Sequence, residues 1–140
     1  MHILCNSNKG DETKLETESK HFVAEFWGVK PDKLSNIKKI KKDMELAVVK
    51  AKGHILNSFS HKFSPQGVSV VITISESNLS IHTFPESEYC AMDIYTCGKT
   101  CPDKAINYLI KEFQPKKSNV IEITRGTKKG IQIKKSKLTF

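Results

Sequence analysis

The feature that most constrains the fold is a series of strand-like segments joined by short turns in the middle of the chain. Residues 68–75 (VSVVITIS) place four apolar side chains on one face and mostly hydroxyl side chains on the other. This period of two is typical of a strand that is buried on one face. Similar segments lie at 54–63, 79–84 and 90–96, and Ser64-Pro65-Gln66-Gly67 is a turn signal. Such runs of adjacent strands favour a mainly antiparallel sheet.

Two other stretches have the period of an amphipathic helix. Between Pro31 and Gly53, apolar residues recur every three or four positions, and lysines fill the opposite face. A second apolar stripe lies between Thr100, which can cap a helix, and Pro115. Further strands are expected at 21–28, 119–124 and, as a short addition, 131–133. The resulting order predicts an α+β two-layer sandwich, in which helices cover one face of a mainly antiparallel sheet.

The length of 140 residues suits one domain with its own core. Residues 1–19 are polar and charged without an apolar period, so we expect a disordered leader there and a single domain over residues 20–140. No stretch approaches the roughly 20 consecutive apolar residues that span a bilayer. No secretory signal is evident at the start. These features predict a cytoplasmic protein that does not bind membranes.

Charge and cysteine usage narrow the classes of function. The formal net charge is +8, but the lysines are spread along the chain and no motif of a nucleic-acid-binding module accompanies them. We therefore expect a solvated lysine-rich surface and no nucleic-acid partner, with a basic binding module as the alternative. The four cysteines, at positions 5, 90, 97 and 101, form no C-x-x-C pair, and no histidine lies at zinc-ligand spacing. We expect free thiols and no metal site.

The most informative motifs lie within residues 61–98. They are HKFSPQGVS (61–69), the Glu76-Ser77 junction, SIHTFPE (80–86) and DIYTCG (93–98). His82 follows Ser77 by five residues, and Cys97 follows it by twenty. In these motifs and intervals the chain resembles the prokaryotic S-adenosylmethionine decarboxylase proenzymes, and the resemblance extends from His21 to about Gly130.

The resemblance implies that the chain cuts itself between Glu76 and Ser77, giving fragments 1–76 and 77–140. In this family the serine hydroxyl attacks the preceding carbonyl, and elimination and hydrolysis then leave a pyruvoyl group, here derived from Ser77. His82 resembles the base that removes the Ser77 α-proton, because a neutral imidazole is available near pH 7. Cys97 resembles the acid that returns a proton to the substrate carbon.

The chemistry of decarboxylation agrees with this resemblance. Loss of CO₂ from an amino acid leaves a carbanion, so the substrate must be linked, as a Schiff base, to a group that withdraws electrons. The seven glycines are dispersed and form no persuasive phosphate-binding loop for pyridoxal phosphate. A pyruvoyl group made from the backbone fits a chain this short. Strands on both sides of the junction are expected to hold the scissile amide in a fixed and strained geometry.

The implied substrate, S-adenosylmethionine, presents an adenine ring and a sulfonium cation, and both suit aromatic faces. Phe63 and Phe84 flank the motifs and are the candidate aromatic contacts. Glu86 is a candidate acceptor for ribose hydroxyls, and Ser69 is a candidate for orienting the junction. The product would feed spermidine synthesis. Similar pyruvoyl proenzymes decarboxylate arginine or ornithine, and these substrates are the alternative.

Two further points concern the family pattern. Many relatives carry histidine directly after the junction serine, whereas this chain has Asn78, which puts the processing rate or the substrate pocket in question. The family also implies a homo-oligomer of processed chain pairs.

Overall fold

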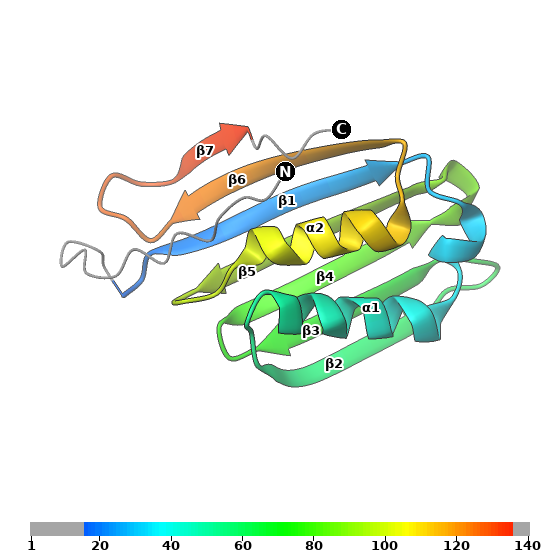
Figure 1. The fold of residues 1–140 in the computed structure, drawn as a ribbon, viewed down its shortest axis with the longest axis horizontal. Helices are drawn as coiled ribbons and strands as arrows, with labels where there is room; N and C mark the ends of the chain where they lie inside the picture. Colours follow the sequence, from blue (N-terminus) through cyan, green and yellow to red (C-terminus); the bar gives the residue numbers. More distant parts are fainter. Residues whose placement is uncertain (1–15, 136–140) are drawn as a thin grey trace.

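The computed structural model describes residues 16–135, which form one sheet and two main helices (Figure 1). The strands are β1 (Ser19–Trp27), β2 (Ile55–Lys62), β3 (Val68–Ile74), β4 (Ser77–Phe84), β5 (Tyr89–Cys97), β6 (Lys117–Arg125) and β7 (Gln132–Lys135). The helices are α1 (Ile37–Lys50) and α2 (Pro102–Phe113), with short 3₁₀ turns η1 (Pro31–Leu34) and η2 (Pro85–Ser87).

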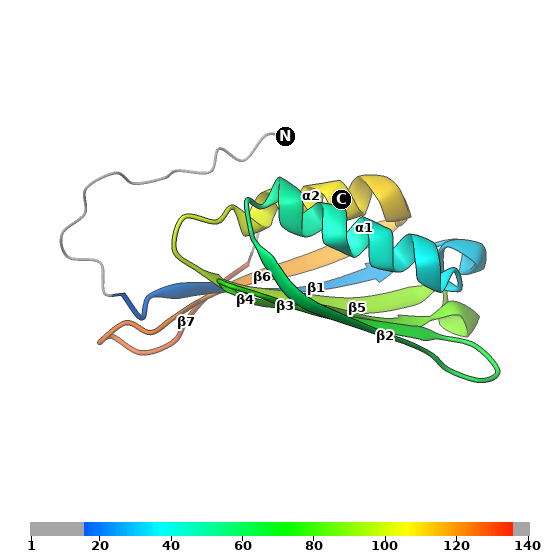
Figure 2. The same cartoon turned by 90° about the horizontal axis from the view of Figure 1, so that it is seen from below.

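All seven strands belong to one antiparallel sheet with the order β2-β3-β4-β5-β1-β6-β7. Both helices lie on the same face of this sheet, as Figure 2 shows edge-on. Helix α1 packs on β2 and β3 and against α2, and α2 packs on β5. The predicted α+β architecture with helices on one face is therefore confirmed.

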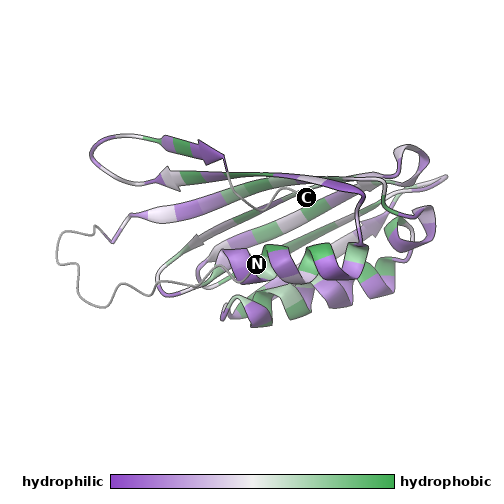
Figure 3. Ribbon diagram, turned by 45° about the horizontal axis from the view of Figure 1, so that its top comes forward, coloured by the Kyte–Doolittle hydropathy of each residue, from purple (hydrophilic) through white to green (hydrophobic). Residues whose placement is uncertain are grey.

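The alternation in β3 explains how the sheet and helices join. Val68, Val70, Ile72 and Ile74 are buried, and they face the apolar stripe of α1. Figure 3 shows the same division in the helices, which are apolar on one side and polar on the other. Because these side chains fill a close-packed core, truncation of Ile72 to alanine is expected to cost roughly 2–5 kcal/mol. The core thus fixes the register of the central strands, on which the site residues lie.

The opposite face of the sheet, which we call the open face, carries no helix. Its alternating side chains include large apolar groups that are about 40–60% exposed. They are Val23, Phe59, Val71, Phe84 and Ile121. An antiparallel sheet can expose one face to water, but an apolar patch of this kind is typical of a contact surface.

Several strand boundaries differ from those expected. β4 begins at Ser77 and β5 extends to Cys97, so both residues lie in strands and not in loops. β1 begins at Ser19, within the expected leader, and residues 1–15 of that leader lie outside the described part of the chain. The short last strand is at Gln132–Lys135 and not at 131–133.

The cysteines also need one correction. Cys90 and Cys97 are free, but Cys101 is disulfide-bonded, so the expectation of free thiols is wrong at this position. None of the helices within residues 16–135 is long and apolar enough to cross a membrane.

Candidate active site

The expected cleavage junction lies in the tight turn between β3 and β4. Ile74 pairs with Ser77 across the hairpin, so Ser75 and Glu76 form the turn and Ser77 is the first residue of β4. Ser77 has a φ of 138°, in the region that side-chain-bearing residues rarely adopt. Such a conformation costs of the order of 1–3 kcal/mol and is found mainly where the surrounding structure enforces it. The junction is therefore strained, as the strand–junction–strand sequence led us to expect.

The backbone of Cys97 is directed at the same junction. Ser77 pairs with Thr96 on β5, and the amide nitrogen of Cys97 donates a hydrogen bond of 3.0 Å to the carbonyl oxygen of Glu76. This carbonyl belongs to the amide that the Ser77 hydroxyl would attack. A donor placed there stabilises the negative charge that develops on the oxygen during attack. The structure therefore brings Glu76, Ser77 and Cys97 together.

The side chain of Glu76 is held by His54, a residue that the motifs did not indicate. One carboxylate oxygen lies 2.7 Å from His54 Nδ1, and the other accepts a hydrogen bond of 3.1 Å from the His54 backbone N–H. Burial alone would raise the pKa of the Glu76 carboxyl, but the hydrogen bonds from the His54 side chain and backbone lower it below its ordinary value. Glu76 is thus anchored through both its carbonyl and its carboxylate.

His82 lies far from the junction within one chain. It follows Ser77 by five residues on the same strand, and five extended residues span about 16 Å. Its exposed imidazole is on the open face, where Nδ1 lies 2.7 Å from the Oγ atom of Ser69, the residue opposite it on β3. Direct proton transfer requires contact at about 3 Å, or through one water. A single chain therefore does not bring His82 to Ser77.

The candidate substrate contacts gather near His82. Phe84 is at the end of β4, with its ring centroid 5.7 Å from that of Tyr89. Phe63 follows β2, and both phenylalanines are about half exposed. Glu86 accepts a hydrogen bond from the side chain of Gln66, which belongs to the turn before β3. With Ser69, these residues form a group that we call the His82 end, opposite the Ser77 end of the sheet.

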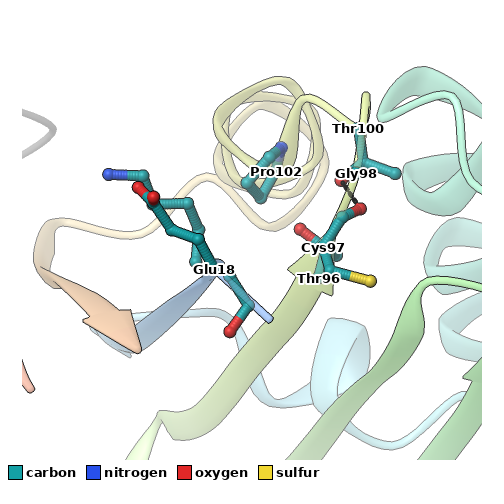
Figure 4. A pocket seen from close by; sticks show the side chains of 8 residues that line it. Glu18, Thr96, Cys97, Gly98, Thr100 and Pro102 are labelled. Carbon is teal, nitrogen blue, oxygen red and sulfur yellow. Dashed lines mark hydrogen bonds between the residues drawn. The ribbon is translucent and has the colours of Figure 1, made fainter. Parts of the chain in front are cut away.

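Two hollows accompany these groups. The hollow at the Ser77 end has a volume of about 30 Å³, the size of one water, and lies between Glu18, Cys97 and the start of α2. In Figure 4 the Cys97 sulfur points away from Glu18 and Pro102, so the thiol is directed out of this hollow. A larger hollow of about 480 Å³ lies on the open face and includes His82, Glu25 and Asn119. Only the second has the size of a small-molecule pocket.

A polar network crosses the open face, and sequence reasoning missed it as well. Arg125 Nη1 lies 3.5 Å from His21 Nδ1, and His21 Nε2 lies 2.7 Å from Asp93 Oδ2. Asp93 also accepts a hydrogen bond from Ser80. The members are separated widely in sequence, and only the strand order places them side by side. Within residues 16–135, no group of three or more histidine, cysteine or acidic side chains is arranged to hold a metal ion.

Similar proteins are known from sequence. A family model described as S-adenosylmethionine decarboxylase matches residues 20–126. The chain is 41% identical over 122 residues to the S-adenosylmethionine decarboxylase proenzyme of Geobacillus sp. (strain WCH70), and the alignment covers 87% of this chain and 98% of that protein. It is also 41% identical over 115 residues to the S-adenosylmethionine decarboxylase proenzyme of Thermococcus kodakarensis, and this alignment covers 81% of this chain and 80% of the relative.

Solved structures show the same relationship. The adenosylmethionine decarboxylase from Aquifex aeolicus VF5 superimposes with a TM-score of 0.74 at 32% identity, over 81% of this chain and 94% of that chain. The Trypanosoma brucei AdoMetDC-delta26 monomer has 18% identity and a TM-score of 0.56, which indicates a similar fold only. The chain belongs to the S-adenosylmethionine decarboxylase family.

Proposed function

We propose that this chain is a proenzyme that cuts itself between Glu76 and Ser77 and then decarboxylates S-adenosylmethionine, in the reaction that supplies the aminopropyl donor for spermidine. The observation that carries the proposal is the hydrogen bond from the Cys97 N–H to the Glu76 carbonyl, beside a Ser77 with a φ of 138°. A polarised carbonyl and a strained neighbouring serine are what an acyl shift at this bond requires.

The cleavage steps use atoms of the junction itself. The Ser77 hydroxyl attacks the Glu76 carbonyl carbon, the C–N bond breaks, and the nitrogen keeps the hydroxyl proton, so that an ester replaces the amide. A base removes the Ser77 α-proton, the Cβ–O bond breaks, and the main-chain carboxylate of Glu76 leaves as the new C-terminus of the first fragment. The dehydroalanine that remains tautomerises to an imine, and water replaces its nitrogen, which departs as ammonia. The new end of the second fragment is a pyruvoyl group.

A pyruvoyl group at position 77 supplies the electron sink that decarboxylation of an α-amino acid needs. The residues present suit this group, because Ser77 supplies its carbon atoms and also carries the hydroxyl that attacks the preceding carbonyl. Cys97 serves as the acid that delivers a proton to the substrate carbon, since its thiol lies on the strand that pairs with Ser77. Cys90 is unsuited to this task because burial raises the pKa of its thiol to about 12.

A second copy of the chain completes the site. His82 and the Ser77 junction lie about 16 Å apart in one chain, at opposite ends of β4. A two-fold pairing of open faces would place the His82 end of each chain over the Ser77 end of the other and form two equal sites. His82 of the partner subunit then removes the Ser77 α-proton, and Ser69 orients its imidazole. The exposed apolar side chains of the open face support such a contact.

The same pairing supplies the substrate pocket. Phe63, Phe84 and Glu86 of one chain would approach the pyruvoyl group of the other and bind adenine and ribose. The relatives reported above are named for S-adenosylmethionine, and none of them is named for arginine or ornithine. S-adenosylmethionine is therefore the favoured substrate.

Intact-mass analysis of the purified protein tests the proposal. Two fragments, 1–76 and 77–140, should appear, and the second should carry a blocked end that resists stepwise sequencing. The Ser77→Ala variant should stay whole, because it lacks the attacking hydroxyl. A wild-type chain that stays whole after long incubation overturns the proposal.

A further inference from the structure

We propose that His54 is a positioning residue for self-cleavage: it holds the carboxylate of Glu76 and so fixes the acyl half of the scissile bond. This inference rests on the proposed cleavage between Glu76 and Ser77. It adds a residue outside the motifs, on a different segment of the chain, to the apparatus that matures the enzyme.

Three contacts place His54 in this role. Its ring Nδ1 lies 2.7 Å from one Glu76 carboxylate oxygen, and its backbone N–H donates to the other at 3.1 Å. Its carbonyl accepts a hydrogen bond of 2.9 Å from the backbone N–H of Ser75, the residue before Glu76. Both residues of the turn are thus fastened to the segment between α1 and β2. The side chain of Glu76 is only 16% exposed, although that of His54 is 78% exposed.

The main-chain carbonyl of Glu76 is held by a different strand from the one beside its carboxylate. Its carbonyl accepts from the Cys97 N–H on β5, while its carboxylate is bound beside β2. A residue held at both ends cannot rotate its carbonyl freely. The angle at which Ser77 Oγ approaches the carbonyl carbon is therefore fixed before reaction, and small losses of alignment in such an attack lower the rate.

The contact does not need a particular charge on the histidine. A neutral imidazole with its proton on Nδ1 donates to the carboxylate, and so does a cationic one. Asparagine places an amide nitrogen at the same distance from the backbone as Nδ1, so it can replace the donor. Alanine cannot, and it leaves only the backbone N–H to hold the carboxylate.

The test measures the rate of self-cleavage of freshly synthesised chain by intact mass. His54→Ala should slow cleavage by about tenfold, the effect of one charge-assisted hydrogen bond lost from the aligned state. His54→Asn should restore most of the rate. Lys50→Ala is the matched control, because it removes an exposed cation from the end of α1 nearby and should leave the rate unchanged.

A second measurement separates positioning from folding. In the uncleavable Ser77→Ala background, hydrogen exchange of the Cys97 amide reports its bond to the Glu76 carbonyl. His54→Ala should speed this exchange by more than any fall in global stability relative to Ser77→Ala accounts for, whereas His54→Asn should leave the exchange close to that of Ser77→Ala alone. If wild type cleaves, and His54→Ala changes neither the rate of cleavage nor the exchange in the Ser77→Ala background, the positioning role is wrong and the proposed function stands. If wild type does not cleave, the proposed function fails first.

Discussion

Ser77 and His82 lie on the same strand, β4, but at opposite ends of it, and no turn within the strand brings them together. This relationship gives the two-copy site a direct test. Co-expressed Ser77→Ala and His82→Ala chains should form mixed pairs, in which the His82→Ala chain supplies Ser77 and the other chain supplies His82. The His82→Ala chain should then be cleaved, whereas each variant alone should stay uncleaved or stop at the ester.

Intact mass of the mixture, with one chain tagged, identifies which chain is cut. Ester accumulation in the His82→Ala chain alone is visible by its cleavage with hydroxylamine. Failure of the mixed sample to cleave, when both chains are shown to pair, would contradict the contribution of His82 from a partner subunit.

The positive φ of Ser77 predicts an effect on stability that is separate from chemistry. Glycine adopts such angles at little cost, whereas alanine does not. Among uncleavable variants, Ser77→Gly should therefore be more stable than Ser77→Ala by about 1 kcal/mol, in spite of the greater chain entropy of glycine. Urea unfolding of the two proteins measures the difference. A glycine variant that is less stable than the alanine variant would show that Ser77 is not strained.

The sequence was sufficient for the fold, because the signals that decide it are local. The alternation in β3 and the stripe in α1 each specify an element and the face that it buries, and both elements form as expected. The motifs likewise indicated Ser77 and Cys97, and the pairing of Ser77 with Thr96 places the Cys97 backbone beside the junction.

The spatial relation of His82 to the junction could not be obtained in this way. A spacing of five residues is compatible with contact across a turn and with separation along a strand, and only the start of β4 at Ser77 decides between them. His54 was missed for a related reason. Its role depends on how the end of α1 meets the β3–β4 turn, a contact between residues 22 apart for which no periodic signal exists.

The lowered pKa of Glu76 predicts how stability depends on pH. Because its folded pKa lies below the ordinary value of 4.5, the ionised group stabilises the fold fully above pH 4.5. That contribution is lost as the pH falls through the folded pKa. The free energy of unfolding of Ser77→Ala, which keeps Glu76, should exceed that of the double variant with Glu76→Gln by an amount that shrinks below pH 4.5. A constant difference between pH 7 and pH 3 would contradict the assignment.

Phe63 and Phe84 predict the order of substrates. Purified, processed enzyme should release CO₂ faster from S-adenosylmethionine than from arginine or ornithine, because exposed rings suit adenine and neither of the other two substrates carries an aromatic base. Phe63→Ala and Phe84→Ala should each weaken S-adenosylmethionine use by about 1–3 kcal/mol in kcat/KM, the range for a base stacked on an aromatic side chain. Val49→Ala, an exposed apolar residue on α1, is the control. Faster release from arginine or ornithine would overturn the substrate and leave the cleavage chemistry intact.

Cys97 contributes to the two reactions through different atoms, and substitution should separate them. Its backbone N–H contacts the Glu76 carbonyl, whereas its thiol is the proposed acid in turnover. Cys97→Ala keeps the N–H, so the chain should still cleave itself at a rate close to wild type. Turnover should fall severely, because water must then protonate the carbon. Separate assays of fragment formation and of CO₂ release measure the two effects. Equal losses in both would place the thiol in cleavage too, and full turnover would remove it as the acid.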